Sequence, residues 1–540
     1  MPANFYRIII LVSFIINQLI VKLGVIRDCS STNLQSKPIA APRTNLNTPS
    51  SNNLNHELDF NMSTPKILDI TIDVAVIGAG TAGLAAYRAA RKQGVSALIV
   101  EGGPYGTTCA RVGCMPSKLL IAAAEAIHAQ DKLKAFGIDV PAATVDGVRV
   151  MNRVRSERDR FVGFVLEGVE SIDANDKLHG YATFKDAHTL EVALENGRSA
   201  IIHAKSIVIA TGSTPIKPVE LAAAGDRLVV NDDVFSWTDL PKSAFVVGAG
   251  VIGLELGQAL SRLGVDVTLM GRRHHIAHLS DPVVRDEALK FFQNEMNYIS
   301  DGRITSVERV ADGVLIHYVD NNDISHSKVF EYLISTAGRR VNLDKLNLPN
   351  TAVALNDKGI PAFNPHTMQI GDTHIFIAGD ANAELPLLHE AADEGAIAGA
   401  NAARIALNAP IELGDRRTPI AIVFSDPNIA SVGTHFRELD LSTSSAGQVS
   451  FHNQGRSRVM LVNHGVLRVY ADIQTRKFLG AEMIGPRNEH IAHLLAWAHQ
   501  MGLTVDQMLA MPFYHPVIEE GLRTALRDLA AHLDSQTAIG

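Results

Sequence analysis

Two glycine-rich turns of the same type, roughly 170 residues apart, constrain the fold of this chain more than any other feature. Each follows an apolar run and precedes a helical stretch and a second apolar run. This order predicts a βαβ unit that binds a dinucleotide, with the pyrophosphate at the N-terminus of the helix. A chain with two such units is expected to bind two dinucleotide cofactors.

The first unit is "DVAVIGAGTAGLAAYRAARKQGVSALIVE", from Asp73 to Glu101. Its glycines are Gly78, Gly80 and Gly83. The first glycine makes the tight turn, the second lets the backbone approach the pyrophosphate, and the third lets the helix pack on the strand. Glu101 ends the second apolar run and is expected to accept hydrogen bonds from ribose hydroxyls.

The second unit is "SAFVVGAGVIGLELGQALSRLGVDVTLMGRR", and its glycines are Gly248, Gly250 and Gly253. Its second strand ends without an acid, in Met270-Gly271-Arg272-Arg273. A carboxylate at this place would pair with a free ribose 2′-hydroxyl, whereas arginine suits a 2′-phosphate. The pattern favours NADP(H); the alternative is that both arginines are simply solvated.

Three more apolar runs end in turn signals. They are "KSIVIATGS", which ends in Thr211-Gly212, "YLISTAGRRVN", which contains Gly338, and "HIFIAGDA", which ends in Gly379-Asp380. Asp380 is thus an acid at the carboxyl end of a strand, where α/β sheets bind ligands. "LPLLHEAADEGAIAGANAARIA" reads as the helix that follows, and from about Arg416 the pattern changes to an α+β module without a nucleotide signature.

Two of the three cysteines, Cys109 and Cys114, lie four residues apart in "TTCARVGCMPSKLL". Three cysteines in 540 residues are no disulfide scaffold, so a close pair indicates redox activity or metal binding. A zinc half-site or two unrelated thiols are the rival interpretations. Zinc needs about four ligands and no second cysteine pair exists, so we expect no metal. Two dinucleotides and a dithiol together suggest electron transfer.

The order of these motifs, closed by "HPVIEE" near the C-terminus, resembles the pyridine nucleotide-disulfide oxidoreductases over roughly Asp73 to Leu529. The stretch "YGTTCARVGCMPSK" is most similar to the dihydrolipoyl dehydrogenase branch of that family. The resemblance implies an α/β fold with two Rossmann-like dinucleotide-binding domains and a C-terminal α+β dimerisation domain. We expect an FAD-binding domain in two parts (62–215 and 336–414), an NAD(P)-binding domain (216–335) and an interface domain (415–540).

The resemblance also implies the roles of single residues. Cys109 and Cys114 would form a redox disulfide on the first turn of a helix, whose N-terminus lowers the thiolate pKa. Cys114 would contact the flavin and Cys109 would exchange with substrate. Lys118, one turn beyond Cys114, would lie near the flavin N5 and pair with Glu255 of "GLELG".

In "HPVIEE", His515 would be the acid–base group of the thiols, because histidine titrates near neutral pH. Glu520 would orient it, and the neighbouring Glu519 would be a surface residue. In the family this histidine reaches the disulfide of the other subunit, so the resemblance implies a homodimer.

The cofactor residues implied by the resemblance form two sets. The FAD set is Gly78, Gly80, Gly83, Glu101, Lys118, Thr211, Gly212 and Asp380. The NAD(P) set is Gly248, Gly250, Gly253, Glu255, Arg272 and Gly338.

The resemblance implies a dihydrolipoyl dehydrogenase that oxidises protein-bound dihydrolipoamide through the cysteine pair and FAD to NAD. The chain lacks a lipoyl domain, so the lipoamide would arrive on a partner, a lipoyl-bearing subunit of a 2-oxoacid dehydrogenase complex. The alternative is an NADPH-dependent reductase of a small disulfide, like glutathione reductase. A third class, a binding protein without turnover, has no need of all five of Cys109, Cys114, Lys118, His515 and Glu520.

Two departures from the family pattern bear on the substrate. Ala110-Arg111 replaces the usual Leu/Val-Asn pair between the cysteines, which puts the usual substrate assignment in doubt. The chain has no C-terminal cysteines, which argues against mercuric reductase.

A net charge of −8 argues against a nucleic-acid partner, which calls for a basic face. The apolar stretch Ile8 to Ile20 is too short to span a membrane, which takes about 20 residues, and a Ser-, Asn- and Pro-rich linker follows to residue 61. It reads as a signal anchor, as a cleaved signal, or as upstream sequence joined to a cytoplasmic protein that begins at Met62. The third interpretation is favoured, and we expect no membrane contact of the catalytic part.

Overall fold

The computed structural model describes residues 67–195 and 197–537. Contacts divide the chain into residues 1–64 and 65–540, and all described residues belong to the second of these units. The predictions for the first 61 residues therefore lie outside the described part, as does Cys29.

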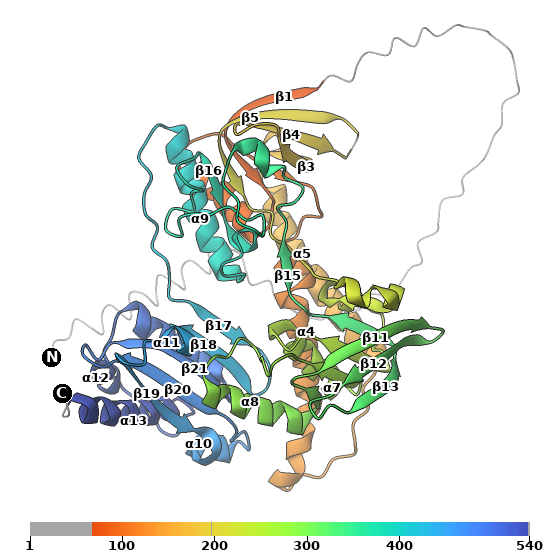
Figure 1. The fold of residues 1–540 in the computed structure, drawn as a ribbon, viewed down its shortest axis with the longest axis vertical. Coiled ribbons are helices and arrows are strands. Elements are labelled where there is room, and N and C mark those ends of the chain that lie inside the picture. Colours follow the sequence, from red (N-terminus) through yellow and green to blue (C-terminus); the bar gives the residue numbers. More distant parts are fainter. Residues whose placement is uncertain (1–66, 196, 538–540) are drawn as a thin grey trace, which may run out of the picture. The chain divides into compact units, whose positions relative to one another are not determined.

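The first predicted βαβ unit forms the centre of a six-stranded sheet (Figure 1). The strands are β1 (Leu68–Ile77), β2 (Ala97–Glu101), β3 (Lys177–Phe184), β4 (Thr189–Leu194), β5 (Ser199–Ile209) and β16 (Ile375–Ile377). β1 runs parallel to both β2 and β5, whereas β4 runs antiparallel between β3 and β5. β16 pairs with β5 although roughly 170 residues separate them, so the sheet is completed by a late segment of the chain.

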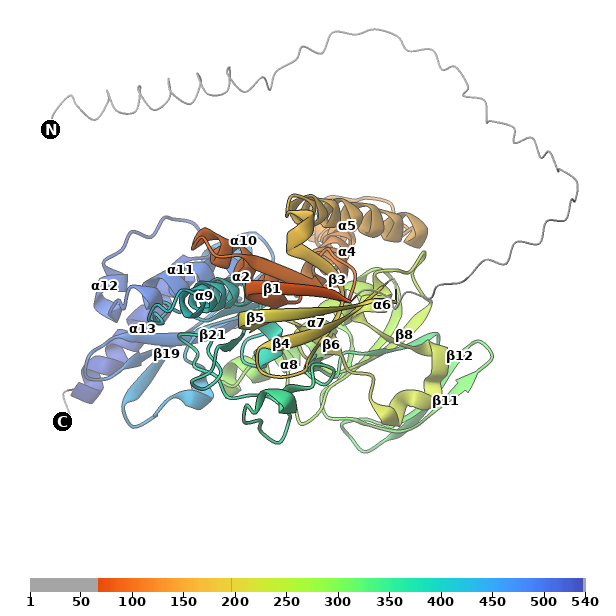
Figure 2. The same cartoon turned by 90° about the horizontal axis from the view of Figure 1, so that it is seen from above.

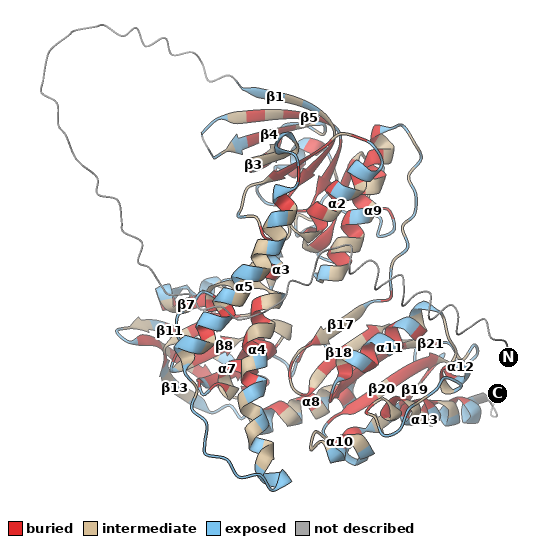
Figure 3. Cartoon of the chain, turned by 180° about the vertical axis from the view of Figure 1, so that it is seen from behind, coloured by how far each residue is buried: buried red, intermediate tan, exposed pale blue. Residues whose placement is uncertain are grey.

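Helices α2 (Thr81–Lys92) and α9 (Leu388–Ala406) pack together on this sheet, as Figure 2 shows from above. The alanines on their facing sides are buried, and they form one apolar cluster with the strand residues Val74, Val76 and Val208. The helix α5 (Gly147–Glu170) is buried along one stripe only, at Met151, Val154 and Val169 (Figure 3).

The second βαβ unit forms a separate parallel sheet of five strands, in the order β10-β9-β8-β14-β7. The strands are β7 (Leu228–Val230), β8 (Ser243–Val247), β9 (Asp266–Met270), β10 (Asn297–Ile299) and β14 (Tyr332–Ser335). Its helices are α6 (Asn231–Val234), α7 (Val251–Arg262) and α8 (Pro282–Glu295). An antiparallel sheet of β11 (Arg303–Val310), β12 (Gly313–Val319) and β13 (Ser325–Phe330) is inserted in the sequence between β10 and β14. A short antiparallel pair, β6 (Ser213–Pro215) and β15 (Arg339–Val341), joins the segments before and after this domain.

The C-terminal module is a five-stranded antiparallel sheet covered by helices. Its strands are β17 (Ile420–Val423), β18 (Asn428–Gly433), β19 (Ser444–Ser450), β20 (Val466–Asp472) and β21 (Phe478–Gly485). Its helices are α10 (Gly455–Val459), α11 (Asn488–Gln500), α12 (Val505–Leu509) and α13 (Glu520–Thr537). α11 and α13 bury their apolar stripes in one cluster with the sheet, so the module has its own core.

A buried carboxylate ties this module to the second nucleotide domain. Glu482 of β21 is fully buried and accepts hydrogen bonds from the backbone N–H groups of Ser280 (2.7 Å) and Asp281 (2.9 Å) before α8. It also accepts from the Phe436 N–H (3.1 Å), the Ser280 hydroxyl and the His435 ring. The residue limits of the three expected domains remain a prediction.

Candidate active site

The turn after β1 brings three backbone segments closer together than any side chain would allow. Gly78 has a φ of +106°, and a Cβ on it would lie 2.3 Å from the Ala210 carbonyl oxygen. A Cβ on Gly83 would lie 1.8 Å from the Gly78 oxygen, so α2 can reach the strand only with glycine there. Gly80, at the start of α2, faces open space within 4 Å. A close turn with free room above the helix N-terminus fits the pyrophosphate of a dinucleotide.

Glu101 lies over the same turn. Its Oε2 accepts a hydrogen bond from the Ala79 N–H (2.7 Å) and its Oε1 from the Gly103 N–H (2.7 Å). The carboxylate is thus fixed beside the glycines at the carboxyl end of β2, where it fits the adenosine ribose of FAD.

The other predicted FAD residues follow β5 and β16. The Thr211 hydroxyl is buried without a hydrogen-bond partner among the described residues, and Gly212 has a φ of +67°. The Asp380 carboxylate accepts from the Ser213 hydroxyl (2.6 Å), and Arg339 lies 3.9 Å away. An orphaned hydroxyl and a partly exposed carboxylate fit the polar linker of FAD.

The turn after β8 repeats the geometry of the first. Gly248 has a φ of +110°, and a Cβ on Gly253 would lie 1.8 Å from the Gly248 oxygen. Gly250 again faces open space, and Gly338, beyond β14, has a φ of +111°. The residues present therefore fit a second dinucleotide.

The cysteines lie on two helices, so the expectation of a single helix is wrong. Cys109 belongs to α3 (Thr108–Val112), and Cys114 is the first residue of α4 (Cys114–His128). The chain breaks at Gly113, where φ is −124° and ψ is −117°, and a Cβ there would approach the Cys109 Cα to 3.1 Å. This fold-back brings the two thiols together across the break.

Both cysteines are free thiols in the structure, which is the reduced form of the pair. A hydrogen bond from the Cys109 thiol lowers the pKa of Cys114 to about 7, and Lys118 adds to this against the effect of burial. The same hydrogen bond, together with burial, raises the pKa of Cys109. Cys114 is thus the thiolate of the pair near neutral pH. No group of three or more His, Cys, Asp or Glu side chains in the described ranges could hold a metal ion.

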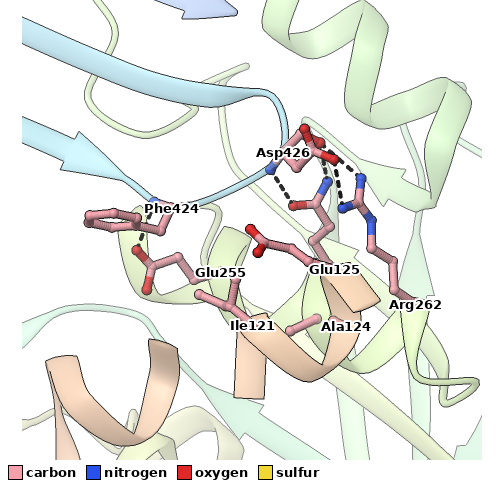
Figure 4. Close-up of a pocket in the computed structure, with 9 residues that line it drawn as sticks. Ile121, Ala124, Glu125, Glu255, Arg262, Phe424 and Asp426 are labelled. Atoms are coloured by element: carbon pink, nitrogen blue, oxygen red, sulfur yellow. Dashed lines mark hydrogen bonds and ion pairs between the residues drawn. The ribbon is translucent and has the colours of Figure 1, made fainter. Parts of the chain in front are cut away.

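Lys118 and Glu255 pair as predicted. The Lys118 ammonium lies 2.8 Å from Oε1 and 2.7 Å from Oε2 of Glu255, whose side chain is 5% exposed. Glu255 Oε1 also accepts from the Phe424 N–H (3.0 Å), and the Lys118 ammonium lies 4.6 Å from the centre of the Phe424 ring. Figure 4 shows Glu255 and Phe424 at a small cavity that Glu125 and Asp426 also line. One ion pair therefore joins α4, α7 and the segment after β17.

His515 and Glu520 form the predicted pair. The His515 Nδ1 lies 2.9 Å from Glu520 Oε2, and Arg523 holds the other oxygen at 3.1 Å. Burial would raise the pKa of Glu520, but the hydrogen bonds from His515 and the Val517 N–H lower it. The His515 side chain is 80% exposed, and its described contacts do not include either cysteine.

Sequence reasoning missed residues that hold the cysteine turn. The buried Asn231 of α6 donates to the Val112 carbonyl (3.2 Å), and the Thr107 hydroxyl accepts from the Ala110 N–H (3.3 Å). Burial raises the pKa of Asp232, against the attraction of Arg339 and Arg111. "NDD" directly after an apolar run was the available signal, because such residues favour helix starts.

The comparisons with known proteins agree with this geometry. Residues 72–395 match the family model of pyridine nucleotide-disulphide oxidoreductases, and residues 420–526 match its dimerisation domain. The chain belongs to this family, whose members use FAD and NAD(P). It is an FAD-dependent oxidoreductase whose dimerisation domain supports a homodimer.

Relatives carry more than one name. A dihydrolipoyl dehydrogenase of Mycobacterium tuberculosis is 30% identical over 85% of this chain and 98% of that protein. A mercuric reductase of Streptomyces lividans is 29% identical over 83% of this chain and 93% of that protein. The structure of the HOCl-induced flavoprotein disulfide reductase RclA from Escherichia coli has the same fold, with a TM-score of 0.70, 20% identity, and coverage of 85% and 99%.

Among the described helices, none combines the length and the apolar character that crossing a membrane requires.

Proposed function

We propose that this protein exchanges two electrons between a dithiol–disulfide couple, with dihydrolipoamide and lipoamide as the first candidate, and a nicotinamide dinucleotide. The observation that carries the proposal is the thiol pair. Cys114 has a pKa of about 7, and one helical turn further on Lys118 forms an ion pair with the buried Glu255. The names of several relatives support the choice of dihydrolipoamide.

The thiol chemistry balances on the two cysteines and the substrate. A substrate thiolate attacks Sγ of Cys109 in the oxidised pair, the Cys109–Cys114 bond breaks, and Cys114 leaves as a thiolate. The second substrate sulfur then attacks the first, closes the product disulfide and releases Cys109. The low pKa of Cys114 makes it the better leaving group, and the higher pKa of Cys109 keeps that sulfur protonated after release.

His515 is proposed to take the proton from each attacking substrate thiol. Glu520 accepts from Nδ1, which fixes the tautomer and leaves Nε2 free to receive the proton. Since His515 is exposed and its described contacts include neither thiol, a partner subunit is proposed to bring its own histidine to this pair.

FAD, when bound, supplies the two-electron relay between the thiols and the nicotinamide. The predicted FAD residues would hold its adenosine and polar linker, and Lys118 would keep a positive charge beside the isoalloxazine ring. Glu255 fixes Lys118 in that place through two oxygens. We propose that protein-bound lipoamide comes from a lipoyl-bearing subunit of a 2-oxoacid dehydrogenase complex.

A second candidate is an NADPH-dependent reductase of a small disulfide such as glutathione disulfide. The observation that favours it is the missing acid after β9, where Gly271 and Arg272 stand. This reaction uses the same residues in the opposite direction.

The test uses the purified protein with FAD. One assay follows the reduction of NAD⁺ by dihydrolipoamide. A second assay follows the oxidation of NADPH by lipoamide and by glutathione disulfide. Cys114→Ser is expected to abolish every thiol reaction and to leave FAD bound. Cys29→Ser is the matched control and should keep full turnover. Loss of FAD from the Cys114→Ser protein would contradict the redox role, and turnover with glutathione disulfide alone would replace the first candidate by the second.

A further inference from the structure

The two nucleotide units differ at one corresponding position. The Gly78 N–H donates to the Val100 carbonyl (2.7 Å), and the Gly248 N–H donates in the same way to the Met270 carbonyl (2.8 Å). The residues that follow, Glu101 and Gly271, therefore occupy the same place beside their glycine turns.

The second unit carries no acid at this place and leaves little room for a side chain there. A Cβ on Gly271 would lie 3.1 Å from the Tyr298 hydroxyl, 3.2 Å from the Ala249 Cβ and 3.2 Å from the Ser300 carbonyl oxygen. Tyr298 is itself buried, with 5% of its surface exposed, so a side chain at residue 271 would have to displace a packed neighbour by a few tenths of an ångström. The ribose 2′-hydroxyl of an unphosphorylated nucleotide thus has no carboxylate to bind here, whereas Glu101 supplies one in the first unit.

The loop after Gly271 is fixed through its backbone. The Arg273 N–H donates to Asp301 Oδ1 (2.7 Å), the His274 N–H donates to the Ser300 carbonyl (3.1 Å), and the His275 N–H donates to the Arg272 carbonyl (3.0 Å). The His274 ring lies 3.0 Å from the Ser300 hydroxyl. The backbone of residues 272–275 is thus held by Ser300 and Asp301.

The side chains of this loop are basic and open to solvent. Arg272, Arg273, His274 and His275 are all exposed. Within the described ranges neither guanidinium has a hydrogen bond or an ion pair, although most other arginines of this domain have one. Two guanidinium groups without a described partner thus follow a strand end that carries no acid.

We propose that this edge of the second nucleotide site binds the 2′-phosphate of NADP(H), and that Arg272 is its main ligand. The inference rests on the proposed function in one respect: the glycine turn between β8 and α7 must hold the nicotinamide dinucleotide. Arg272 directly follows the position that corresponds to Glu101, so it is the first side chain that can reach the 2′ substituent. A guanidinium makes paired, charge-assisted hydrogen bonds to a phosphate, which a hydroxyl cannot match.

Direct binding tests the proposal without turnover. Calorimetry compares adenosine 2′,5′-bisphosphate with adenosine 5′-monophosphate on the full chain with FAD bound. The bisphosphate is expected to bind about tenfold more tightly or better, and its affinity should fall with added salt. Arg272→Ala should remove this preference and leave the monophosphate affinity unchanged. Equal affinity of the two nucleotides for the unmodified protein would overturn the proposal.

A charge-matched control separates a local contact from a change of net charge. Arg285 of α8 is paired with the exposed Asp286, and Arg285→Ala should keep the preference for the bisphosphate. An equal loss in both variants would overturn the assignment of Arg272.

A further assay separates a failure of the proposed function from a failure of this inference. Reduction of ferricyanide by NADPH and by NADH does not need the thiols, so it is measured in the Cys114→Ser variant. A preference for NADPH in this variant, together with an unmodified protein that turns over no disulfide, would contradict the proposed function alone. Turnover of lipoamide with no preference for the phosphorylated nucleotide would contradict this inference alone.

Discussion

Cys114 owes its acidity to a neighbouring residue as well as to its place at the start of α4. The helix N-terminus was the cause expected from the sequence, and the structure adds a hydrogen bond from the Cys109 thiol, which lowers the pKa of Cys114. Lys118, one turn further along α4, contributes in the same direction. The same hydrogen bond therefore lowers the pKa of Cys114 and raises the pKa of Cys109.

The first prediction concerns the reactivity of this thiol. In the reduced protein, alkylation of Cys114 by iodoacetamide should accelerate as pH rises through about 7, because the thiolate is the reactive form. Cys109→Ala removes the hydrogen bond, so the inflection should move up towards the ordinary value of 9.0. The measurement is the rate of modification of the Cys114 peptide by mass spectrometry. An inflection that stays near 7 in the variant would rule out Cys109 as the main cause.

At this scale the sequence predicted residue types better than their geometry. The glycines and Glu101 could be placed because their roles follow from a local motif. Thr107 could not, because it adopts a φ of +58° that threonine rarely takes, and only the cap it gives to Ala110 explains its presence there. The break at Gly113 was not predicted either, although Gly113 and Pro116 are residues that favour a helix boundary.

At the scale of elements, Glu482 shows how a single buried group joins two domains. Burial would raise the pKa of this carboxyl, but the hydrogen bonds from His435, Asp281 and Ser280 outweigh it and hold the pKa at about 2. The ionised form is therefore stabilised in the folded protein and links the start of α8 to β21.

The second prediction follows from the sign of this shift. A carboxyl whose pKa is depressed on folding stabilises the protein above its ordinary value of 4.5, and this stabilisation is lost as pH falls from 4.5 towards 2. Glu482→Gln should lower the free energy of unfolding by about 2 kcal/mol at pH 7 and by less at pH 3.

Urea unfolding at both pH values measures the difference. Glu308→Gln on the exposed face of β11 is the control and should change the stability by less than about 0.5 kcal/mol. The same loss for Glu482→Gln at pH 3 as at pH 7 would contradict the linkage.

The sequence predicted the helices and strands of the βαβ units better than the antiparallel strands. The strands and helices of the two βαβ units, and the late segment β16, follow from apolar runs bounded by glycine turns. The antiparallel β4, β11, β12 and β13 were not predicted. β4, β11 and β13 are half-exposed and lack continuous apolar runs, whereas β12 is apolar and largely buried but has no glycine turn of the nucleotide type beside it.

At the scale of the whole molecule, the exposed His515 supports our proposal that a second subunit completes the active site. The chain carries the dimerisation domain of its family, and His515 directly precedes α13 of that domain. The sequence alone could assign this histidine only through the resemblance, since no spacing within one chain relates it to Cys109.

The third prediction tests whether the site is shared between subunits. Cys114→Ser and His515→Ala homodimers should both be inactive in dithiol oxidation. After joint unfolding and refolding, half of the dimers are mixed, and each mixed dimer has one site with an intact cysteine pair and an intact histidine. Activity should therefore return to about a quarter of the wild-type level. Activity that stays at the background of the two parents would place the histidine on its own subunit's thiols.

Glu255 contacts Lys118 of the first domain and the backbone of Phe424 at the start of the C-terminal module, while it belongs to the second nucleotide domain. Three segments of the chain thus meet at one carboxylate, which also sets the charge beside the reactive thiol. Substitution of Glu255 would change the packing of these three segments and the charge beside Cys114 at the same time. A family member that acts on another substrate is therefore expected to differ at residues beside the cysteines, such as Arg111, and to keep Glu255 and its contacts.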